Sequence, residues 1–280
     1  MATSNRERIG HSYPAQSFTM TRDAASAYAA ATDDPNPRYP AEAPPMSAVI
    51  WALPAGALPV MDEALIVDTS RILKLLHGEQ EIRWHRAAKP GDVLSTVATV
   101  KSIEDKGTGE LLEIETRTHD ASAAAVVDMT WGFFIRHSKK DLKPASGEPK
   151  PEKIATLPSR APDAELSWTV AKDQSLRYAE ASGDRNPIHT DDAMAKMAGL
   201  NGIILHGLCT MAFAQRAIVD QVLAGDASRL ARLRVRFAKP VYPGETLTAR
   251  IWNTGERQLA LEVVNAAGDV ILKDATADLR

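Results

Sequence analysis

A carboxylate, a carboxamide and an imidazole lie within six residues of one another, in Asp184, Asn186 and His189. Because Pro187 fixes its own φ and biases Asn186 away from the helical region, the chain is expected to turn here. The turn lets Asp184 and His189 point into one pocket and hold a water molecule between a base and an acid. The spacing therefore predicts acid–base chemistry on a bound water molecule.

A second polar feature follows some eighteen residues later, where His206 and Gly207 precede an apolar segment. The first N–H groups of a helix have no partner within the helix and can receive negative charge. Gly207 is therefore predicted to donate its N–H to a developing oxyanion, although a glycine here also suits close helix packing. Together with Asp184 and His189, it supplies the parts needed to add water across an activated double bond.

The elements that position these groups are indicated by hydrophobic periodicity. Apolar residues at three-to-four spacing predict a long helix with one buried face, formed by Leu208, Met211, Ala212, Ile218, Val219 and Val222. A shorter helix carrying Tyr178 is expected before it, with Asp173 as its N-cap. Strand-like runs occur at residues 80–87, 93–103, 110–119, 123–136, 231–238, 246–254, 257–265 and 269–277.

The chain is a divergent tandem repeat by its internal similarity. Residues 28–39 align with residues 178–189 at a constant offset of 150. Residues 89–94 align with residues 242–247 at an offset of 153. A shared pattern at a nearly constant offset is what duplication leaves. Each copy is expected to run in the order helix, motif loop, long helix and strands.

The two copies differ where chemistry is expected. Tyr39 stands where the second copy has His189, and residues 44–50 contain no His-Gly pair. The first copy is therefore predicted to be a scaffold and binding half without the acid and the oxyanion donor. We predict an amino-terminal half over residues 1–137, a Pro-rich linker over 138–162 and a catalytic half over 163–280.

The motif Asp184-x-Asn186-Pro187-x-His189, followed by Leu205-His206-Gly207, resembles the hydratase 2 motif of the MaoC-like 2-enoyl-CoA hydratases. Residues 76–80, 105–109 and 236–244 are also similar to the hydratase 2 domains of peroxisomal multifunctional enzymes of type 2. The likeness covers roughly residues 15–280. It implies an α+β double hot-dog fold, in which each half wraps an antiparallel sheet around a long central helix.

The resemblance also implies roles for individual residues. Asp184 and His189 would bind and activate water, Asn186 would hold His189 or the water, and Gly207 would be the oxyanion donor. Substrate contacts carried over in the same way are His77, Gly78, Lys106 and Phe237. Three alternatives stay open: Asn186 as a turn former, Lys106 as a solvated hairpin lysine and Phe237 as a core residue of its strand.

The reaction that the resemblance implies is reversible hydration of a trans-2-enoyl-CoA to a (3R)-3-hydroxyacyl-CoA. Coenzyme A would be part of the acyl-CoA substrate, and neither a metal nor a redox cofactor is expected. Rival hypotheses are a hot-dog acyl-CoA thioesterase, a non-catalytic acyl-CoA-binding module and an inert structural partner of another hot-dog subunit. The length, branching and polarity of the acyl chain are left open; residues 51–59 are expected to shape its pocket.

Composition excludes other classes of function. The chain has 280 residues, 25% of them charged, and a net charge of −3, so no basic footprint for nucleic acid is present. No apolar stretch approaches the length of a membrane span, and a polar start and the absence of a Ser-Lys-Leu ending favour a cytoplasmic location. The single cysteine, Cys209, is expected to be a core residue and excludes an internal disulfide. A homodimer is implied by the family.

Overall fold

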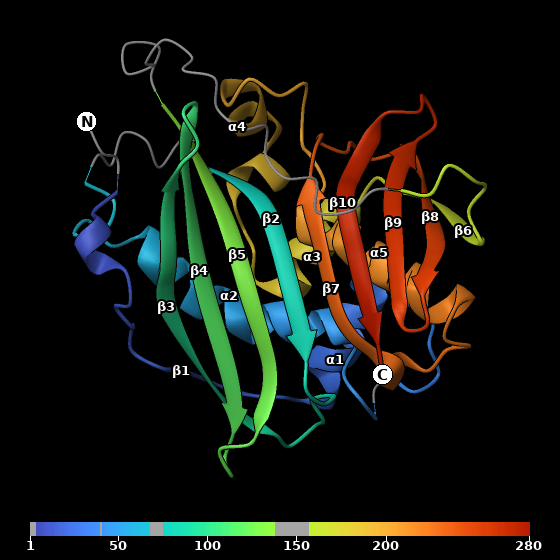
Figure 1. The fold of residues 1–280 in the computed structure, drawn as a ribbon, viewed down its shortest axis with the longest axis horizontal. Helices are drawn as coiled ribbons and strands as arrows, with labels where there is room; N and C mark the ends of the chain where they lie inside the picture. Colours follow the sequence, from blue (N-terminus) through green and yellow to red (C-terminus); the bar gives the residue numbers. More distant parts are fainter. Residues whose placement is uncertain (1–3, 40, 68–74, 138–156) are drawn as a thin grey trace.

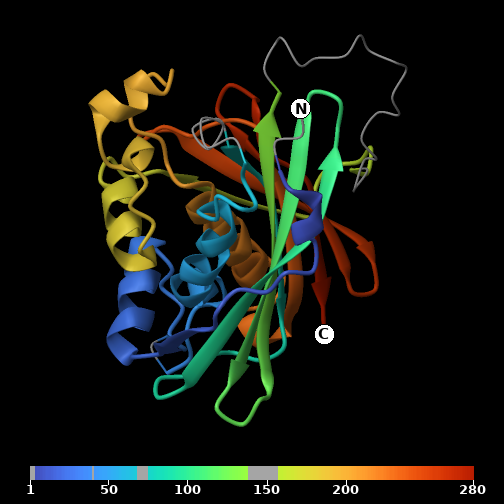
Figure 2. The same cartoon turned by 90° about the vertical axis from the view of Figure 1, so that its left-hand side faces the viewer.

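A computed structural model, describing residues 4–39, 41–67, 75–137 and 157–280, shows one antiparallel sheet with helices on one of its faces (Figures 1 and 2). The described strands run in the order β1-β3-β4-β5-β2-β7-β10-β9-β8-β6. Their bounds are β1 Gln16–Thr19, β2 Leu75–Trp84, β3 Val93–Asp105, β4 Gly109–Asp120, β5 Ala125–Arg136, β6 Ala164–Thr169, β7 Leu230–Phe237, β8 Thr246–Gly255, β9 Gln258–Asn265 and β10 Val270–Leu279.

The helices form two layers over the sheet. The long helices α2 and α5 lie against the strands, and the shorter α1 and α3 pack on each other farther out (Figure 2). Their bounds are α1 Arg22–Ala31, α2 Val49–Val60, α3 Gln174–Ser182, α4 Asp192–Met197 and α5 Gly207–Gln221, with 3-10 turns η1 Arg6–Arg8, η2 Pro45–Ala48, η4 Pro187–His189 and η5 Ala227–Arg229. Five strands wrapped on one long helix, twice in one chain, confirm the predicted α+β double hot-dog fold.

The eight predicted strands are all present; seven agree with the prediction to within about two residues at each end, whereas β2, at Leu75–Trp84, begins and ends earlier than the predicted 80–87. Two further strands, β1 and β6, precede the first helix of each half and correct the predicted order of elements. They are short edge strands that alternate between exposed and half-buried positions, so they lack a continuous apolar run. Helix α4, which lies between the motif and α5, was also not predicted, because its six residues are too few for a periodic pattern.

The predicted burial of α5 is confirmed, and one predicted cap is wrong. Helix α5 is buried over most of its length, and Cys209 is fully buried within it. Asp173 occupies the N-cap position of α3, but its side chain makes no capping hydrogen bond. Its carboxylate lies 3.2 Å from Nε of Arg177 instead, one turn along the helix. An exposed ion pair has therefore replaced the cap that Asp173 was expected to make.

Hydrogen bonds relate equivalent positions of the two halves. The hydroxyl groups of Tyr28 and Tyr178 meet at 3.1 Å, across an offset of 150 residues. The Ala43 N–H donates to the Ala88 carbonyl at 2.9 Å, and the Leu205 N–H donates to the Val241 carbonyl at 2.7 Å. These two main-chain bonds place residues 43 and 205 at equivalent positions. Neither of the offsets found in the sequence aligns them.

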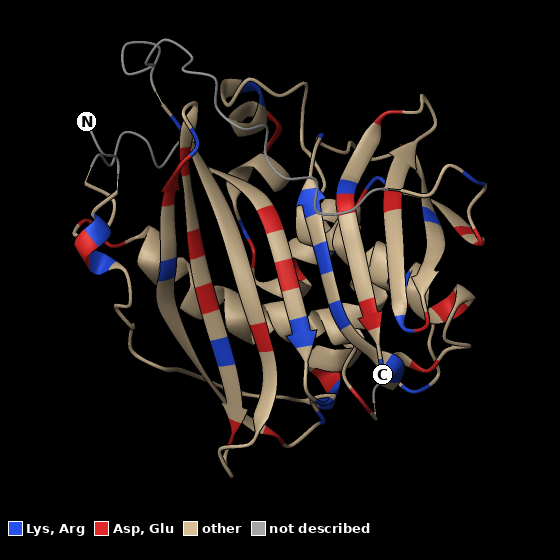
Figure 3. Ribbon diagram, viewed as in Figure 1, with Lys and Arg blue, Asp and Glu red and all other residues tan. Residues whose placement is uncertain are grey.

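The two halves meet where β2 pairs with β7 at the centre of the sheet. On the exposed face, acidic side chains of β2 lie beside arginines of β7 (Figure 3). The Glu79 carboxylate receives Arg236 at 3.0 Å and Arg234 at 3.1 Å, and its side chain is 18% exposed. Arg232, which is 14% exposed, donates to Glu81 at 2.8 Å. These ion pairs therefore join the halves from a partly dehydrated position, where an unpaired charge is costly.

Replacing Glu79 by Gln is expected to lower the free energy of unfolding by about 2 kcal/mol, because two arginines lose a charged acceptor. Urea unfolding measures the change. Glu165→Gln is the matched control, since its ion pair with Arg250 at 3.3 Å is half exposed on both sides. An exposed pair of this kind is worth about 0.5 kcal/mol or less. Equal losses in the two variants would contradict a special role for the β2–β7 ion pairs.

The predicted linker lies mostly outside the described residues, which omit 138–156. Residues 157–162 have no helix or strand.

No helix within 4–39, 41–67, 75–137 and 157–280 combines the length and apolarity that crossing a membrane requires.

Candidate active site

The Asp184 turn is built by local hydrogen bonds after α3. The helix ends at Gly183, whose φ of 80° is a left-handed conformation that glycine adopts without strain. Asp184 Oδ1 accepts the Asn186 N–H at 3.2 Å, and Asn186 Oδ1 accepts the Ile188 N–H at 3.3 Å. These side-chain turns lead the chain into η4 and bring His189 back towards Asp184.

His189 is held in one tautomer. Its Nδ1 lies 2.8 Å from the carbonyl oxygen of Ile204. Since a carbonyl can only accept, Nδ1 carries the proton and Nε2 of the neutral ring has a free lone pair. Burial lowers the pKa of His189, because loss of hydration penalises the charged form. The ring is therefore prepared to accept a proton at Nε2.

His206, the residue before α5, connects the motif loop to the start of that helix. Its Nε2 lies 2.9 Å from the main-chain carbonyl oxygen of Asp184 and donates to it. Its ring stacks on that of His189, with centroids 3.8 Å apart and planes inclined by 25°. Burial, with a smaller effect of His189, lowers the pKa of His206 to about 4. His206 is thus a neutral ring that positions both Asp184 and His189.

The spacing of the cluster suits a water molecule. Asp184, His189 and His206 each offer a polar atom, and these atoms lie within 4.8 Å of one another. Two groups that share one tetrahedral water at about 2.8 Å are roughly 4.6 Å apart. The same side-chain types can bind zinc, but neighbouring ligands of a tetrahedral zinc ion are only about 3.4 Å apart. The 4.8 Å span of the cluster is therefore closer to the separation of two groups that share a water molecule than to that of two zinc ligands.

Gly207 opens α5 beside the ring of Phe237. A Cβ at Gly207 would lie 3.0 Å from two ring carbons of Phe237, so glycine allows the close approach of helix and strand. As the first residue of the helix, Gly207 has an N–H that no helical carbonyl can accept. The packing explanation of this glycine therefore holds in the structure, and the oxyanion role of its N–H, which has no acceptor within the helix, stays a prediction.

His77 reaches this site from the other half. Its ring centroid lies 5.0 Å from that of Phe237, and its Nε2 lies 3.0 Å from Oε1 of Gln80. Burial lowers the pKa of His77 to about 4, and Asp184 is near enough to oppose that shift. His77, Phe237 and Gly207 therefore pack together, and strand β2 of the amino-terminal half forms one wall of the site.

The other three residues predicted for the site are Asn186, Gly78 and Lys106. Asn186 is exposed, and its side-chain oxygen is used in the turn. Gly78 lies beside His77, at a shift in the register between β2 and β5. Lys106 lies in the β3–β4 hairpin, paired with Glu104. That hairpin shares an end of the sheet with His77, but β4 and β5 separate them, at roughly 14 Å for three strand spacings.

The amino-terminal half repeats the turn and its aspartate, but without the imidazole and the main-chain donor. Asp34 Oδ1 accepts the Asn36 N–H at 3.2 Å, as Asp184 does for Asn186. Because residues 43 and 205 are equivalent, Pro44 and Pro45 occupy the positions of His206 and Gly207. Proline has no N–H, so the predicted loss of the oxyanion donor has a direct cause. Tyr39 takes the place of His189.

Two family models match the chain, one on each half. The MaoC like domain matches residues 153–275, and the dehydratase domain region of the FAS1-like proteins matches residues 7–129. Fold and site therefore define a double hot-dog protein with one intact MaoC-type motif.

The chain is also similar to whole proteins. It is 36% identical to 3-hydroxyacyl-thioester dehydratase Y of Mycobacterium tuberculosis, over 79% of this chain and 78% of that protein. It is 34% identical to the mouse peroxisomal multifunctional enzyme type 2 over 74% of this chain, but spans only 28% of that enzyme's length. A MaoC-like dehydratase from Phytophthora capsici superposes with a TM-score of 0.83 at 29% identity, covering 99% of both chains. The protein belongs to the MaoC-like hydratase and dehydratase family.

His206 is the site residue that the sequence interpretation did not assign. The signal was present, since His206 precedes the predicted oxyanion donor. Its hydrogen bond to a main-chain carbonyl twenty-two residues earlier in the chain has no signature in local spacing.

Proposed function

We propose that the protein catalyses the reversible hydration of a trans-2-enoyl-CoA to a (3R)-3-hydroxyacyl-CoA, without a metal or a redox cofactor. The observation that carries this proposal is the cluster of Asp184, His189 and His206, the last of which directly precedes Gly207 at the start of α5. Relatives named as enoyl-CoA hydratase 2 and 3-hydroxyacyl-thioester dehydratase support the class of reaction. Homodimerisation and a cytoplasmic location stay predictions from the sequence.

The thioester carbonyl oxygen accepts the Gly207 N–H, which draws electron density from the conjugated double bond. As the water oxygen bonds to C3, one water proton passes to the Asp184–His189 pair and the carbonyl oxygen gains enolate charge. The enolate then reforms the carbonyl, and the pair returns one proton to C2. The product carries the hydroxyl on C3, and no net proton is gained or lost. The two side chains share this work, because groups that contact one water titrate as a coupled pair.

In this proposal the tautomer of His189 determines which of the two proton transfers it takes part in first. Its Nδ1 proton is engaged by Ile204, so the neutral ring offers only a lone pair at Nε2 to the water. His189 therefore takes part first as an acceptor, with its imidazole kept neutral by burial. In this proposal His77, Gly78 and Phe237 contact the substrate beside Gly207, and Lys106 binds a distant phosphate of coenzyme A.

The dependence of kcat/KM on pH tests the role of His189. The pKa of His189 lies below its ordinary value of about 6.5, so the neutral, active ring dominates above that pH. We expect kcat/KM for crotonyl-CoA to be flat from about pH 8 to pH 6.5 and to fall at lower pH, as Nε2 becomes protonated. His189→Gln is expected to bind substrate and lose turnover. A rate that rises as the pH falls through this range would require an imidazolium acid and contradict the assignment.

A further inference from the structure

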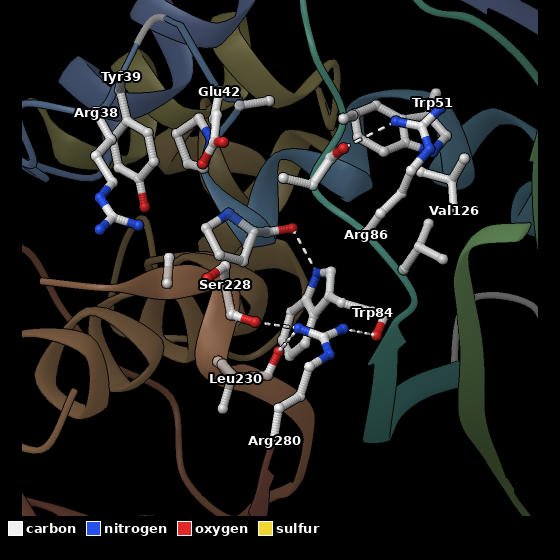
Figure 4. A pocket seen from close by; sticks show the side chains of 17 residues that line it. Arg38, Tyr39, Glu42, Trp51, Trp84, Arg86, Val126, Ser228, Leu230 and Arg280 are labelled. Atoms are coloured by element: carbon white, nitrogen blue, oxygen red, sulfur yellow. Dashed lines mark hydrogen bonds between the residues drawn. The ribbon is translucent and has the colours of Figure 1, made fainter.

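The amino-terminal half contains a pocket between the end of β2 and the start of β7. Its empty volume, including the open mouth, is about 520 Å³. Tyr39, Trp51 and Trp84 line it together with Arg280, whose guanidinium lies against Trp84 (Figure 4). The pocket is distant from the predicted catalytic residues. Seven residues of β2 separate His77 from Trp84, which is about 23 Å at about 3.3 Å a residue.

This pocket is the counterpart of the candidate active site. Three residues of the candidate active site have equivalents in the wall of this pocket at the offsets of the repeat. Tyr39 corresponds to His189 at an offset of 150, and Trp84 to Phe237 at an offset of 153. Leu230 of the other half corresponds to His77, also at 153. Because β2 and β7 are antiparallel, the two sites lie at opposite ends of the pair.

The replacements change what the counterpart pocket can bind. Pro45 replaces Gly207, and Trp84 Nε1 donates to its carbonyl at 2.9 Å. With Leu230 in place of His77, the walls are mainly apolar. Two side-chain donors are left without a hydrogen-bond partner among the described residues: the buried hydroxyl of Tyr39 and the indole N–H of Trp51, a residue that is 4% exposed. A buried donor without an acceptor is costly, so the pocket favours a ligand with an acceptor oxygen.

The arginines of the wall already have partners within the protein. Arg86 pairs with Asp92 at 2.6 Å and with Asp120 at 2.8 Å. Arg38, at the rim, pairs with Asp226 at 2.5 Å. The guanidinium of Arg280 donates to the carbonyls of Trp84, Ser228 and Leu230. The arginines of the wall therefore use their N–H groups on carboxylates and main-chain carbonyls of the protein, and Glu42 adds a negative charge to the lining.

We propose that the counterpart pocket is a second, non-catalytic binding site for a short, uncharged acyl compound that offers acceptor oxygens to the unpartnered donors of Tyr39 and Trp51. The ligand is held and not converted, because the wall offers neither the imidazole nor the main-chain donor of the other site. The distance from Gly207 makes this ligand a second molecule and not the tail of a short-chain substrate. Binding here is independent of the proposed hydration.

The test is a titration of the full-length, 15N-labelled protein with S-butyryl-N-acetylcysteamine, followed through its indole N–H signals. This thioester is uncharged, lacks the nucleotide of coenzyme A and is saturated, so it cannot be hydrated. The chain has five tryptophans, and Trp51→Phe identifies the signal of Trp51 by its loss. We expect a saturable shift of that signal. Tyr39→Phe, which keeps the ring, is expected to weaken binding about fivefold by removing one hydrogen bond.

A variant of the pocket mouth supplies the control. Ser228 is exposed and lines the pocket, so Ser228→Phe is expected to block entry and abolish the shift. Ser159→Phe, at an exposed position that does not line the pocket, is expected to leave the shift unchanged. A Trp51 signal that does not move at saturating thioester, or that moves equally in Ser228→Phe, would overturn the proposal.

Two further titrations identify which kind of molecule supplies the acyl group. Butyryl-CoA that shifts the Trp51 signal as the small thioester does would assign the site to coenzyme A thioesters as well. Free butyrate is expected to bind at least tenfold more weakly, because Arg38 and Arg86 are paired with carboxylates and Arg280 already donates to three main-chain carbonyls; equal binding would overturn the uncharged ligand. None of these readouts needs turnover, so a protein without hydratase activity would leave the second site standing.

Discussion

Asp184→Asn is expected to lower kcat for the hydration of crotonyl-CoA about a thousandfold, a loss typical of removing a positioned acid–base group. The asparagine keeps the shape of the side chain, and its oxygen can still accept the Asn186 N–H that forms the turn. What it cannot do is take a proton from water. The loss of enoyl absorbance under saturating substrate measures the effect, and KM is expected to change little.

The tandem repeat provides a matched control for this variant. Asp34 occupies the equivalent position, accepts the same kind of main-chain hydrogen bond and is 8% exposed. Burial raises its pKa to about 6, so the neutral carboxamide of Asp34→Asn suits its surroundings. We expect Asp34→Asn to keep kcat within about twofold of the parent protein. Equal losses in the two variants would show that the fold, and not the acid–base pair, is being disturbed.

Gly207→Pro is expected to reduce kcat by about a further hundredfold relative to Gly207→Ala, because proline removes the N–H that meets the enolate oxygen. The exchange is conformationally allowed. Proline is well accepted as the first residue of a helix, and His206 before it is extended, with φ −58° and ψ 133°. The amino-terminal half already has this arrangement, with Pro45 opening η2.

The alanine variant separates the donor from the packing. Both substitutions place a Cβ about 3.0 Å from the ring of Phe237, so both introduce that close contact. Only the proline variant lacks the N–H. If Gly207→Ala and Gly207→Pro had the same kcat, the glycine would serve to pack the helix against β7 and the oxyanion role would be withdrawn.

The sequence predicts most of the fold because its signals are local or repeated. The apolar spacing after Gly207 predicts α5, and the eight strand-like runs correspond to β2–β5 and β7–β10. The order of the halves follows from the two offsets. The edge strands β1 and β6 could not be predicted in this way, since they gain their stability from pairing with β3 and β8 and not from their own composition.

The features of the candidate site fall into the same two groups: those that local sequence signals predict and those that only the fold brings together. Asp184, His189 and Gly207 are found from the spacing of the motif, because turn and helix start are local features. The hydrogen bond from His206 to Asp184 and the packing of His77 on Phe237 join residues far apart in the chain. The tautomer of His189 depends on Ile204, fifteen residues away, which only the folded chain places beside it. The counterpart pocket could not be predicted from the sequence either, because it depends on how β2 pairs with β7.

The central claim is that water is added to a carbon–carbon double bond and not to the thioester carbonyl. The most direct test follows crotonyl-CoA in one reaction by enoyl absorbance and by release of free thiol. We predict that enoyl absorbance falls to an equilibrium value with no thiol released, and that Asp184→Asn abolishes the fall while Asp34→Asn does not. Thiol released in step with substrate consumption would identify a thioesterase and contradict the account.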